Sequence, residues 1–170
     1  RQRQMCIRDS VQALLKKAAA LPVKTVCPLH GPVWRENIAW FVDKYDKWSS
    51  YTPEENAVTI FYGSVYGHTQ EAAEILASCL ADLEVKNIKV YDVSAQHSSY
   101  LVAEAFRCSH LVFASSTYNA GIFENMDILI DDLIKHALQN RKVALIENGS
   151  WASTAGMLMK EKLSKCKNTE

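Results

Sequence analysis

The segment Tyr62–Thr69 (Tyr-Gly-Ser-Val-Tyr-Gly-His-Thr) places two glycines and the hydroxyls of Ser64 and Thr69 between an apolar strand and an amphipathic helix. The strand is expected over residues 58–62, which are β-branched or aromatic. A helix that begins after such a turn presents unpaired amides and the positive end of its dipole, which favour an anion. We therefore predict a phosphate-binding turn. The expected apolar face of the helix consists of Ala72, Ile75, Leu76, Cys79, Leu80 and Leu83.

The kind of phosphate is indicated by what this turn lacks. No Lys follows the second glycine, so nothing would reach the β- and γ-phosphates of a triphosphate, and the dinucleotide pattern Gly-x-Gly-x-x-Gly is also missing. Amides and hydroxyls without a cation suit a single terminal phosphate. The expected ligand contacts are Ser64, Val65, Tyr66, Gly67, His68 and Thr69, with the Thr69 hydroxyl on the phosphate and Ser64 opposite. The alternative is a glycine-containing turn without a ligand.

Two further polar loops follow predicted strands at residues 111–114 and 143–146. In an open parallel sheet, loops that leave the carboxyl ends of the strands meet at one edge, where ligands bind. The expected contacts in these loops are Thr117, Tyr118, Asn119, Ala120, Gly121, Ile122 and Phe123, and Asn148, Gly149, Ser150, Trp151, Thr154 and Gly156.

From residue 57 onward, strands and helices alternate, which predicts right-handed crossovers and a parallel sheet. A second strand is expected near residues 88–93 and a short helix near 99–106. A further amphipathic helix should bury Met126, Leu129, Ile130, Leu133, Ile134 and Ala137, and the last helix is expected at residues 155–165.

The turn Ser64–Thr69 resembles the first loop of flavodoxins, hydroxyl-x-hydroxyl-Gly-x-Thr. This resemblance implies an α/β fold, a flavodoxin-like doubly wound parallel sheet with strand order 2-1-3-4, with the fifth strand missing from this chain. It also implies FMN as cofactor. Tyr118 and Trp151 are then candidates to stack on the flavin ring, and Asn119 and Asn148 to meet its polar edge.

A second stretch, Cys27–Trp34 (Cys-Pro-Leu-His-Gly-Pro-Val-Trp), resembles the end of the metallo-β-lactamase-like domain of flavodiiron proteins, also called A-type flavoproteins. In that family a His-Gly-Pro turn supplies an iron ligand, here His30, and a flavodoxin-like domain follows. The resemblance implies a parent that reduces nitric oxide or dioxygen, receives electrons from a rubredoxin-like or other donor and forms a homodimer. The di-iron centre is expected in the full-length parent only. No catalytic acid, base or nucleophile is expected in this chain.

The expected organisation is therefore a non-native leader (residues 1–10), a short α-rich remnant of the metallo-β-lactamase-like domain (11–48), a linker (49–56) and an FMN-binding domain that is truncated at its C-terminus (57–170). The alternatives are a flavodoxin-type electron carrier or flavin quinone reductase with an unrelated N-terminal extension, and a flavodoxin-like interaction module without cofactor. The motif at residues 27–34 argues against the carrier, and the phosphate turn argues against the cofactor-free module.

Composition sets the outer bounds. The 170 residues are 48% hydrophobic and 22% charged, with 19 basic and 19 acidic side chains, so there is no basic surplus to favour nucleic acid. No apolar stretch is long enough to predict a membrane span. The five cysteines are odd in number and include no Cys-x-x-Cys pair, which favours free thiols in a reducing cytoplasm. Cys79 is expected to be a buried core thiol.

Overall fold

The chain divides into two compact units, one that ends at Thr52 and one that begins at Pro53. The computed structural model describes residues 2–170, with side chains from residue 9 onward. The division falls inside the stretch 49–56 that the sequence predicts as a linker. The helix before it runs to Ser50 and the strand after it begins at Glu55, so the segment without regular structure is shorter than predicted.

The first unit contains two helices, α1 (Gln2–Ala18) and α2 (Ile38–Ser50). α1 begins at Gln2, so it includes residues 2–10 of the segment that the sequence predicts as a non-native leader. Gln12 joins the two helices, since its amide nitrogen donates to Asp46 Oδ1 at 3.0 Å and to Ser49 Oγ at 2.7 Å. Between the helices, an antiparallel bridge from Val26 to Trp34 closes a turn.

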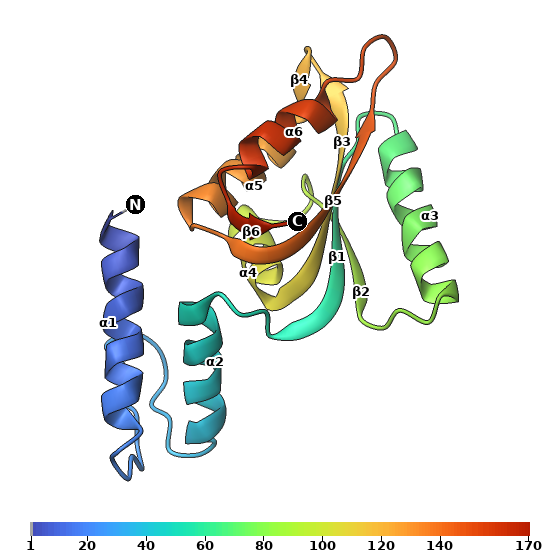
Figure 1. The fold of residues 1–170 in the computed structure, drawn as a ribbon. Coiled ribbons are helices and arrows are strands. Elements are labelled where there is room, and N and C mark those ends of the chain that lie inside the picture. Colours follow the sequence, from blue (N-terminus) through green and yellow to red (C-terminus); the bar gives the residue numbers. More distant parts are fainter. Residues whose placement is uncertain (1) are drawn as a thin grey trace. The chain divides into compact units, whose positions relative to one another are not determined.

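The second unit is a parallel sheet with alternating helices (Figure 1). Its strand order is β2-β1-β3-β5, which confirms the predicted order 2-1-3-4. The strands are β1 (Glu55–Gly63), β2 (Ile88–Asp92), β3 (Cys108–Tyr118), β4 (Gly121–Ile122), β5 (Gln139–Asn148) and β6 (Lys167–Thr169). The helices are α3 (His68–Asp82), α4 (Ser98–Arg107), α5 (Glu124–Lys135) and α6 (Ala155–Leu163).

The short strand β6 corrects the expectation that the fifth strand is missing. β6 lies parallel to β5, and Val143 N donates to Glu170 O at 2.7 Å while Glu170 N donates to Arg141 O at 3.2 Å. The segment Lys167–Thr169 has no apolar side chain and so gives no strand signal in the sequence. It pairs because the outer edge of β5 offers main-chain groups that need partners.

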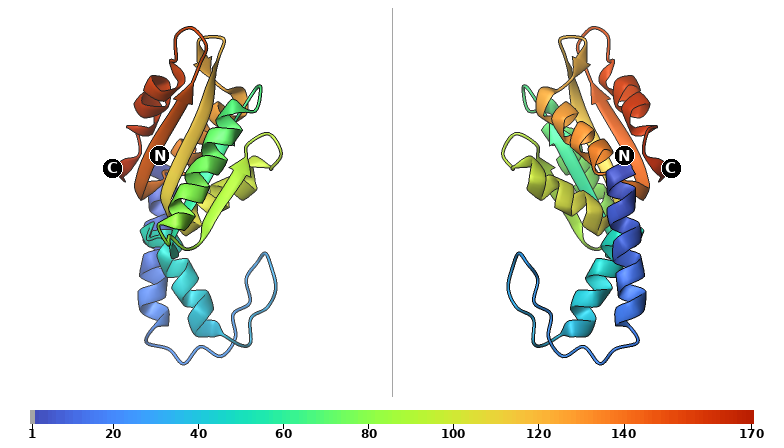
Figure 2. Two further views of the ribbon diagram at one scale, coloured as in Figure 1. Left: turned by 90° about the vertical axis from the view of Figure 1, so that its right-hand side faces the viewer. Right: turned by 90° about the vertical axis from the view of Figure 1, so that its left-hand side faces the viewer.

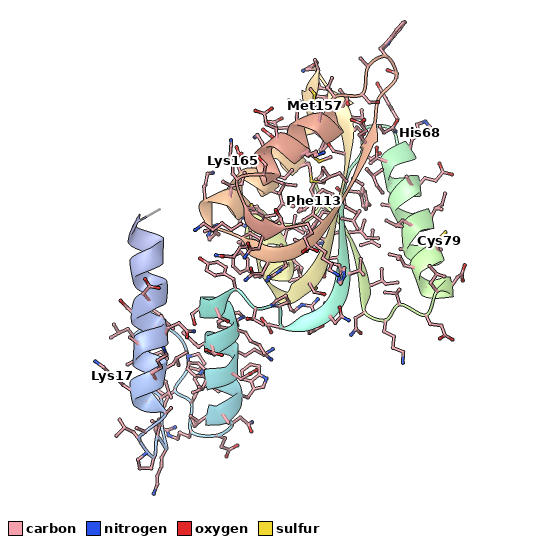
Figure 3. All side chains as sticks on the ribbon, in the orientation of Figure 1. Lys17, His68, Cys79, Phe113, Met157 and Lys165 are labelled. Atoms are coloured by element: carbon pink, nitrogen blue, oxygen red, sulfur yellow. The ribbon has the colours of Figure 1, made fainter. Side chains whose placement is uncertain are left out.

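Helices cover the two faces of the sheet unequally (Figures 1 and 2). The larger core lies on the side of α4, α5 and α6, where Phe61 and Phe113 from the sheet meet Met126, Leu129 and Leu133 of α5. Figure 3 shows Phe113 at the centre of this unit. The predicted apolar face of the helix at residues 124–135 is therefore confirmed, except that Ala137 lies beyond the helix end at Lys135.

On the other side of the sheet, α3 packs through smaller residues than predicted. Its buried face contains Thr69 and Ala73, with Leu76, Ala77 and Leu80 partly buried beside them. Ile75, Cys79 and Leu83 are exposed, so the predicted face was wrong for these three positions. Ala73 and Ala77 lie on the face that meets the sheet together with Leu76 and Leu80, and this face leaves Ile75 and Leu83 on the outer side of the helix. Cys79 is consequently an exposed thiol and not a core thiol (Figure 3).

Arg141, on β5, is 2% exposed and closes the end of α4. Its guanidinium donates to the carbonyl oxygens of Ala105, at 3.1 Å, and Phe106 in the last turn of that helix. It also reaches the carbonyls of Gln139 and Asn140. Burial lowers the pKa of Arg141 to about 10, so the side chain stays charged at neutral pH. A cation at a helix C-terminus is stabilised by the helix dipole and by the unpaired carbonyls.

Glu104 of α4 is the centre of a second, ionic junction. It is 8% exposed and accepts hydrogen bonds from Arg107 at 2.6 Å and from Lys89 of β2 at 3.4 Å. Arg107 also pairs with Glu55 at the start of β1. Burial raises the pKa of Glu104, but the hydrogen bonds and charges of Arg107 and Lys89 lower it by more, so the net pKa lies below the ordinary value.

Glu104→Gln should lower the free energy of unfolding near neutral pH by about 1–3 kcal/mol, because it removes the charge that Arg107 and Lys89 neutralise. Since the pKa of Glu104 is lowered by folding, its contribution is complete above the ordinary carboxyl pKa and is lost as pH falls through the lowered value. Urea unfolding at several pH values should therefore show the gap between wild type and variant closing in acid. Glu161→Gln, at an exposed position on α6, is the control, and a gap that is constant with pH would contradict the assignment.

Candidate functional site

The three central strands end at the same level, which brings the three predicted loops to one edge of the sheet. In the parallel ladders, Gly63 of β1 is paired with Ser115 of β3, and Ser115 is paired with Glu147 of β5. The loops at residues 63–69, 117–123 and 148–156 therefore leave neighbouring strands side by side. This is the edge at which open α/β sheets bind ligands.

The first loop leaves the start of α3 open. Gly67 is the N-cap residue, with φ 91°, and as a glycine it has no side chain that could cap the helix. The loop holds itself in place, because Gly67 N donates to Ser64 Oγ at 3.0 Å. A Cβ added at Gly67 would meet nothing within 4 Å. The glycine therefore allows the left-handed backbone conformation, and it leaves space for an anion to approach the first amides of α3.

Thr69 lies in the first turn of α3, as predicted, but its hydroxyl is already bonded within the protein. Thr69 Oγ1 lies 2.8 Å from Ser116 Oγ and accepts from Asn148 Nδ2 at 3.4 Å. Ser116 Oγ in turn donates to Gly63 O at 3.2 Å. These bonds join the first loop to the ends of β3 and β5. In this structure the Thr69 side chain, 1% exposed, therefore links the strand ends and is covered by them.

The second loop is a β-hairpin, which the sequence did not predict. Tyr118 and Gly121 are paired antiparallel between β3 and β4, and the two residues between them, Asn119 and Ala120, have φ values of 49° and 56°. Positive φ at both central positions is the mark of a type I′ turn. Tyr118, half exposed at this turn, is free to contact a ligand.

The end of the second loop turns inward. Ile122 is 9% exposed, and the ring of Phe123 packs against the larger core. A Cβ at Gly63 would lie 2.5 Å from the Phe123 ring, so Gly63 makes room for that ring. Phe123 N donates to Ser115 Oγ at 3.2 Å. At these two predicted contact positions the side chains therefore belong to the core.

The third loop is tied to the second through hydroxyl groups. Thr117 Oγ1 accepts from Thr154 N at 3.0 Å and from Ala155 N at 3.2 Å, and Thr154 Oγ1 donates to Ala120 O at 3.1 Å. The hydroxyls of Thr117 and Thr154 thus fix the spacing of the two loops. Trp151, in the third loop, is 99% exposed and makes its indole available to a flat ligand.

The remaining predicted contacts lie on the surface of the same edge. Val65 and Tyr66 are exposed, with 41% and 88% of their surface accessible. His68 is exposed at the first position of α3, with Nδ1 4.0 Å from Glu71. The other predicted positions on this edge are Gly149, Ser150 and Gly156.

Sequence reasoning did not select Glu147, Ser115 or Ser116. These side chains contact main-chain or hydroxyl groups in other segments. A local sequence pattern does not predict contacts of this kind. A carboxylate at the end of a strand was the available signal, and it is a weak one.

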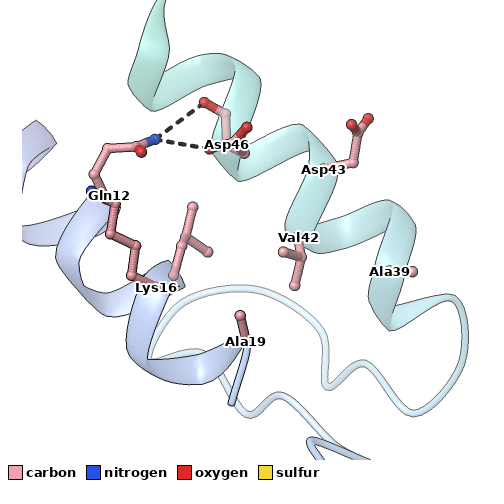
Figure 4. A pocket seen from close by; sticks show the side chains of 8 residues that line it. Gln12, Lys16, Ala19, Ala39, Val42, Asp43 and Asp46 are labelled. Carbon is pink, nitrogen blue, oxygen red and sulfur yellow. Dashed lines mark hydrogen bonds between the residues drawn. The ribbon is translucent and has the colours of Figure 1, made fainter. Parts of the chain in front are cut away.

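His30, the predicted iron ligand, is exposed on the turn that the Val26–Trp34 bridge closes. Within the described residues, no three His, Cys, Asp or Glu side chains gather as a metal site would require. A groove between α1 and α2 is lined by Gln12, Lys16, Asp43 and Asp46 with apolar neighbours, and within it Gln12 donates to Asp46 (Figure 4). In the described part of the chain, no helix is both long and apolar enough to cross a membrane.

Comparison with known proteins adds independent findings. Residues 60–166 match the family described as flavodoxin. The chain is 28% identical over 132 residues to an anaerobic nitric oxide reductase flavorubredoxin of Vibrio vulnificus, a match that covers 77% of this chain and 26% of the relative. The chain thus spans about a quarter of the length of that relative.

Among solved structures, the rubredoxin oxygen:oxidoreductase of Desulfovibrio gigas superposes with a TM-score of 0.84 at 21% identity, over 96% of this chain and 41% of that one. The flavodiiron protein of Giardia intestinalis gives 0.85 at 16% identity, over 96% and 42%. These two likenesses establish the fold. With the flavorubredoxin match, they confirm the resemblance to flavodiiron proteins that the sequence predicts.

Ala120→Gly should raise the free energy of unfolding by about 1 kcal/mol, because it removes the Cβ penalty of a left-handed backbone. The hydrogen bond from Thr154 to the Ala120 carbonyl does not depend on that side chain. Ala95→Gly is the matched control, since Ala95 is exposed in a loop with an ordinary φ, and there the greater freedom of the unfolded chain should destabilise slightly. Thermal unfolding of both variants measures the difference, and equal destabilisation would refute the strain at residue 120.

Proposed function

Because this chain belongs to the flavodoxin family, we propose that it is the FMN-binding electron-transfer domain of a flavodiiron nitric oxide or dioxygen reductase. The observation that carries this proposal is the uncapped start of α3 behind Gly67, at the edge where two aromatic side chains stand exposed. The reductase activity and the di-iron centre belong to the longer parent in this proposal. We also propose that this parent receives electrons from a rubredoxin-like donor, forms a homodimer and is located in the cytoplasm.

The phosphate of FMN is proposed to lie at the start of α3. The residues present fit it, because Gly67 leaves open space and supplies no side chain to cap the first amides of α3. Ser64 has a hydroxyl hydrogen to donate while its oxygen accepts from Gly67 N. The donors are main-chain amides and a hydroxyl, and the turn contains no Lys or Arg. This set of donors suits one terminal phosphate better than a pyrophosphate.

The flavin ring is proposed to lie between the second and third loops. Tyr118 and Trp151 offer exposed aromatic faces there, and the threonine bonds hold the two loops at a fixed spacing. Bound FMN would supply the electron transfer. The protein residues bind and orient the ring and need no acid or base of their own.

The N-terminal unit is proposed to belong to the iron-binding part of the parent through His30. The described residues do not by themselves fit a di-iron centre, since such a centre takes several His and carboxylate ligands and no such group forms among them. No step of electron transfer is assigned to iron in this chain.

The first test is selectivity among flavins. The purified chain should quench FMN fluorescence as the ring stacks, and FMN should bind more tightly than FAD, because the α3 turn has room and donors for one terminal phosphate. A fluorescence titration measures both dissociation constants. FAD binding as tight as FMN binding would contradict the phosphate assignment, and no binding of either flavin would refute the proposed function.

The second test is a single hydroxyl. Ser64→Ala removes a hydrogen bond to a charged group, which is worth roughly 1.5–3 kcal/mol, so FMN should bind about tenfold to a hundredfold more weakly. Riboflavin, which has no phosphate, should be nearly unaffected. Ser78→Ala, further along α3, is the control, because its hydroxyl donates to Glu74 O, one turn earlier in the same helix. Equal losses for FMN and riboflavin would place Ser64 in loop folding and not at the phosphate.

A further inference from the structure

The last two residues of β5 send their side chains to different helices. Asn148 reaches the first turn of α3, where its amide donates to Thr69 Oγ1. Glu147 reaches the first turn of α6, where its Oε2 accepts from Gly156 N at 2.8 Å. Successive side chains on a strand point to opposite faces of the sheet, which is why neighbouring residues can serve both helices.

Glu147 supplies α6 with a capping bond that the helix's own N-cap residue does not make. Thr154 is the N-cap residue, but its side chain makes no capping bond and donates to Ala120 O instead. An N-cap side chain normally accepts from the second or third amide of the helix. Gly156 is the second residue of α6, so the Glu147 carboxylate takes the place of the missing cap, and its charge suits the positive end of the helix dipole.

Gly156 is the counterpart that this contact requires. A Cβ at residue 156 would lie 2.8 Å from Glu147 Oε2 and 3.0 Å from its Cδ. A side chain at this position would therefore displace the carboxylate. The chain thus offers two independent ways to remove the contact, one at each partner.

The contact closes the base of the loop that carries Trp151. Because the Trp151 side chain is almost fully exposed, it adds little packing to hold its own segment in place. Hydrogen bonds hold the base of this loop, through Glu147 with Gly156 and Thr117 with Thr154 and Ala155, and Ser153 Oγ donates to Gly149 O at 3.5 Å within it. A loop that is already ordered loses less entropy when it binds a ligand.

We propose that Glu147 is a positioning residue, whose carboxylate latches the base of the loop 148–156 and holds the Trp151 segment ready for the flavin ring. The proposal rests on the proposed function for the nature of the ligand. Glu147 acts through Gly156 and the loop, and it does not touch the phosphate, which is placed at the start of α3.

The latch can be measured without flavin. In Glu147→Ala, amide hydrogen exchange at Gly156 should accelerate about fivefold, the factor that corresponds to the loss of a typical helix cap. Glu147→Gln keeps an oxygen acceptor and should stay within about twofold of wild type. Gly156→Ala should mimic Glu147→Ala by loosening the neighbouring amides of the first turn. Glu161→Ala, which removes an exposed carboxylate from the other end of α6, should leave the exchange at Gly156 unchanged.

Flavin binding provides the second measurement. Glu147→Ala should weaken FMN and riboflavin by the same factor, about threefold to tenfold, because the loop contacts the ring that both share. The ratio of the two dissociation constants should stay at the wild-type value. Ser64→Ala should change that ratio, which separates the ring loop from the phosphate turn.

Unchanged exchange at Gly156 in Glu147→Ala would overturn the latch, and so would a Gln variant that loses as much protection as the Ala variant. A selective loss of FMN would show that Glu147 acts on the phosphate and would also overturn it. If the wild type binds neither flavin, the proposed function fails, and the exchange at Gly156 alone decides whether the latch exists.

Discussion

The parallel pairing of β1, β3 and β5 is the constraint on which the site depends. Their main-chain ladders run in register, so Gly63, Ser115 and Glu147 lie at one level of the sheet. Each strand must then turn over the same edge to reach the helix that follows it. Three loops that are distant in the sequence consequently share one small region, and their side chains need only short bonds to meet.

Many polar side chains at this edge bond to neighbouring segments, while other groups at the edge stay accessible. Thr69, Ser116 and Asn148 join three strand ends, while Thr117 and Thr154 join two loops. The start of α3 and the aromatic rings of Tyr118 and Trp151 stay accessible. An open helix start beside exposed aromatic rings fits the proposed binding of a nucleotide with an aromatic ring. Because the loops are held by their own bonds, little reorganisation should accompany binding.

The sequence predicts the parts of this protein that follow from local pattern. The alternation of strands and helices, the buried face of α5 and the turn at residues 62–69 all have periodic or glycine-based signals, whereas the order of the sheet was implied by the resemblance to flavodoxins. The face of α3 was predicted less well, because Ala73 and Ala77 form a second possible face and only the sheet decides between them. The apolar residues Ile75 and Leu83 then lie outside, against their own hydrophobicity.

Other features could not be predicted from the sequence, because they depend on contacts with residues that are distant along the chain. Arg141 is charged and would be placed on the surface, yet it is buried because the open carbonyls of α4 end beside it. The short strand β6 consists of polar residues and pairs only because the edge of β5 is available. At the site, the hairpin at Asn119 and Ala120 has no glycine at either position with positive φ. Glu147 caps a helix to which it does not belong.

The central claim is that FMN binds with its phosphate at the start of α3 and its ring between the other two loops. An amide NMR titration of the full chain with FMN, compared with riboflavin, tests it residue by residue. The account predicts that both flavins shift the amides around Tyr118 and Trp151, and that only FMN strongly shifts those from Gly67 to Gln70. Phosphate-dependent shifts at the start of α5 or α6, with the start of α3 unmoved, would contradict it.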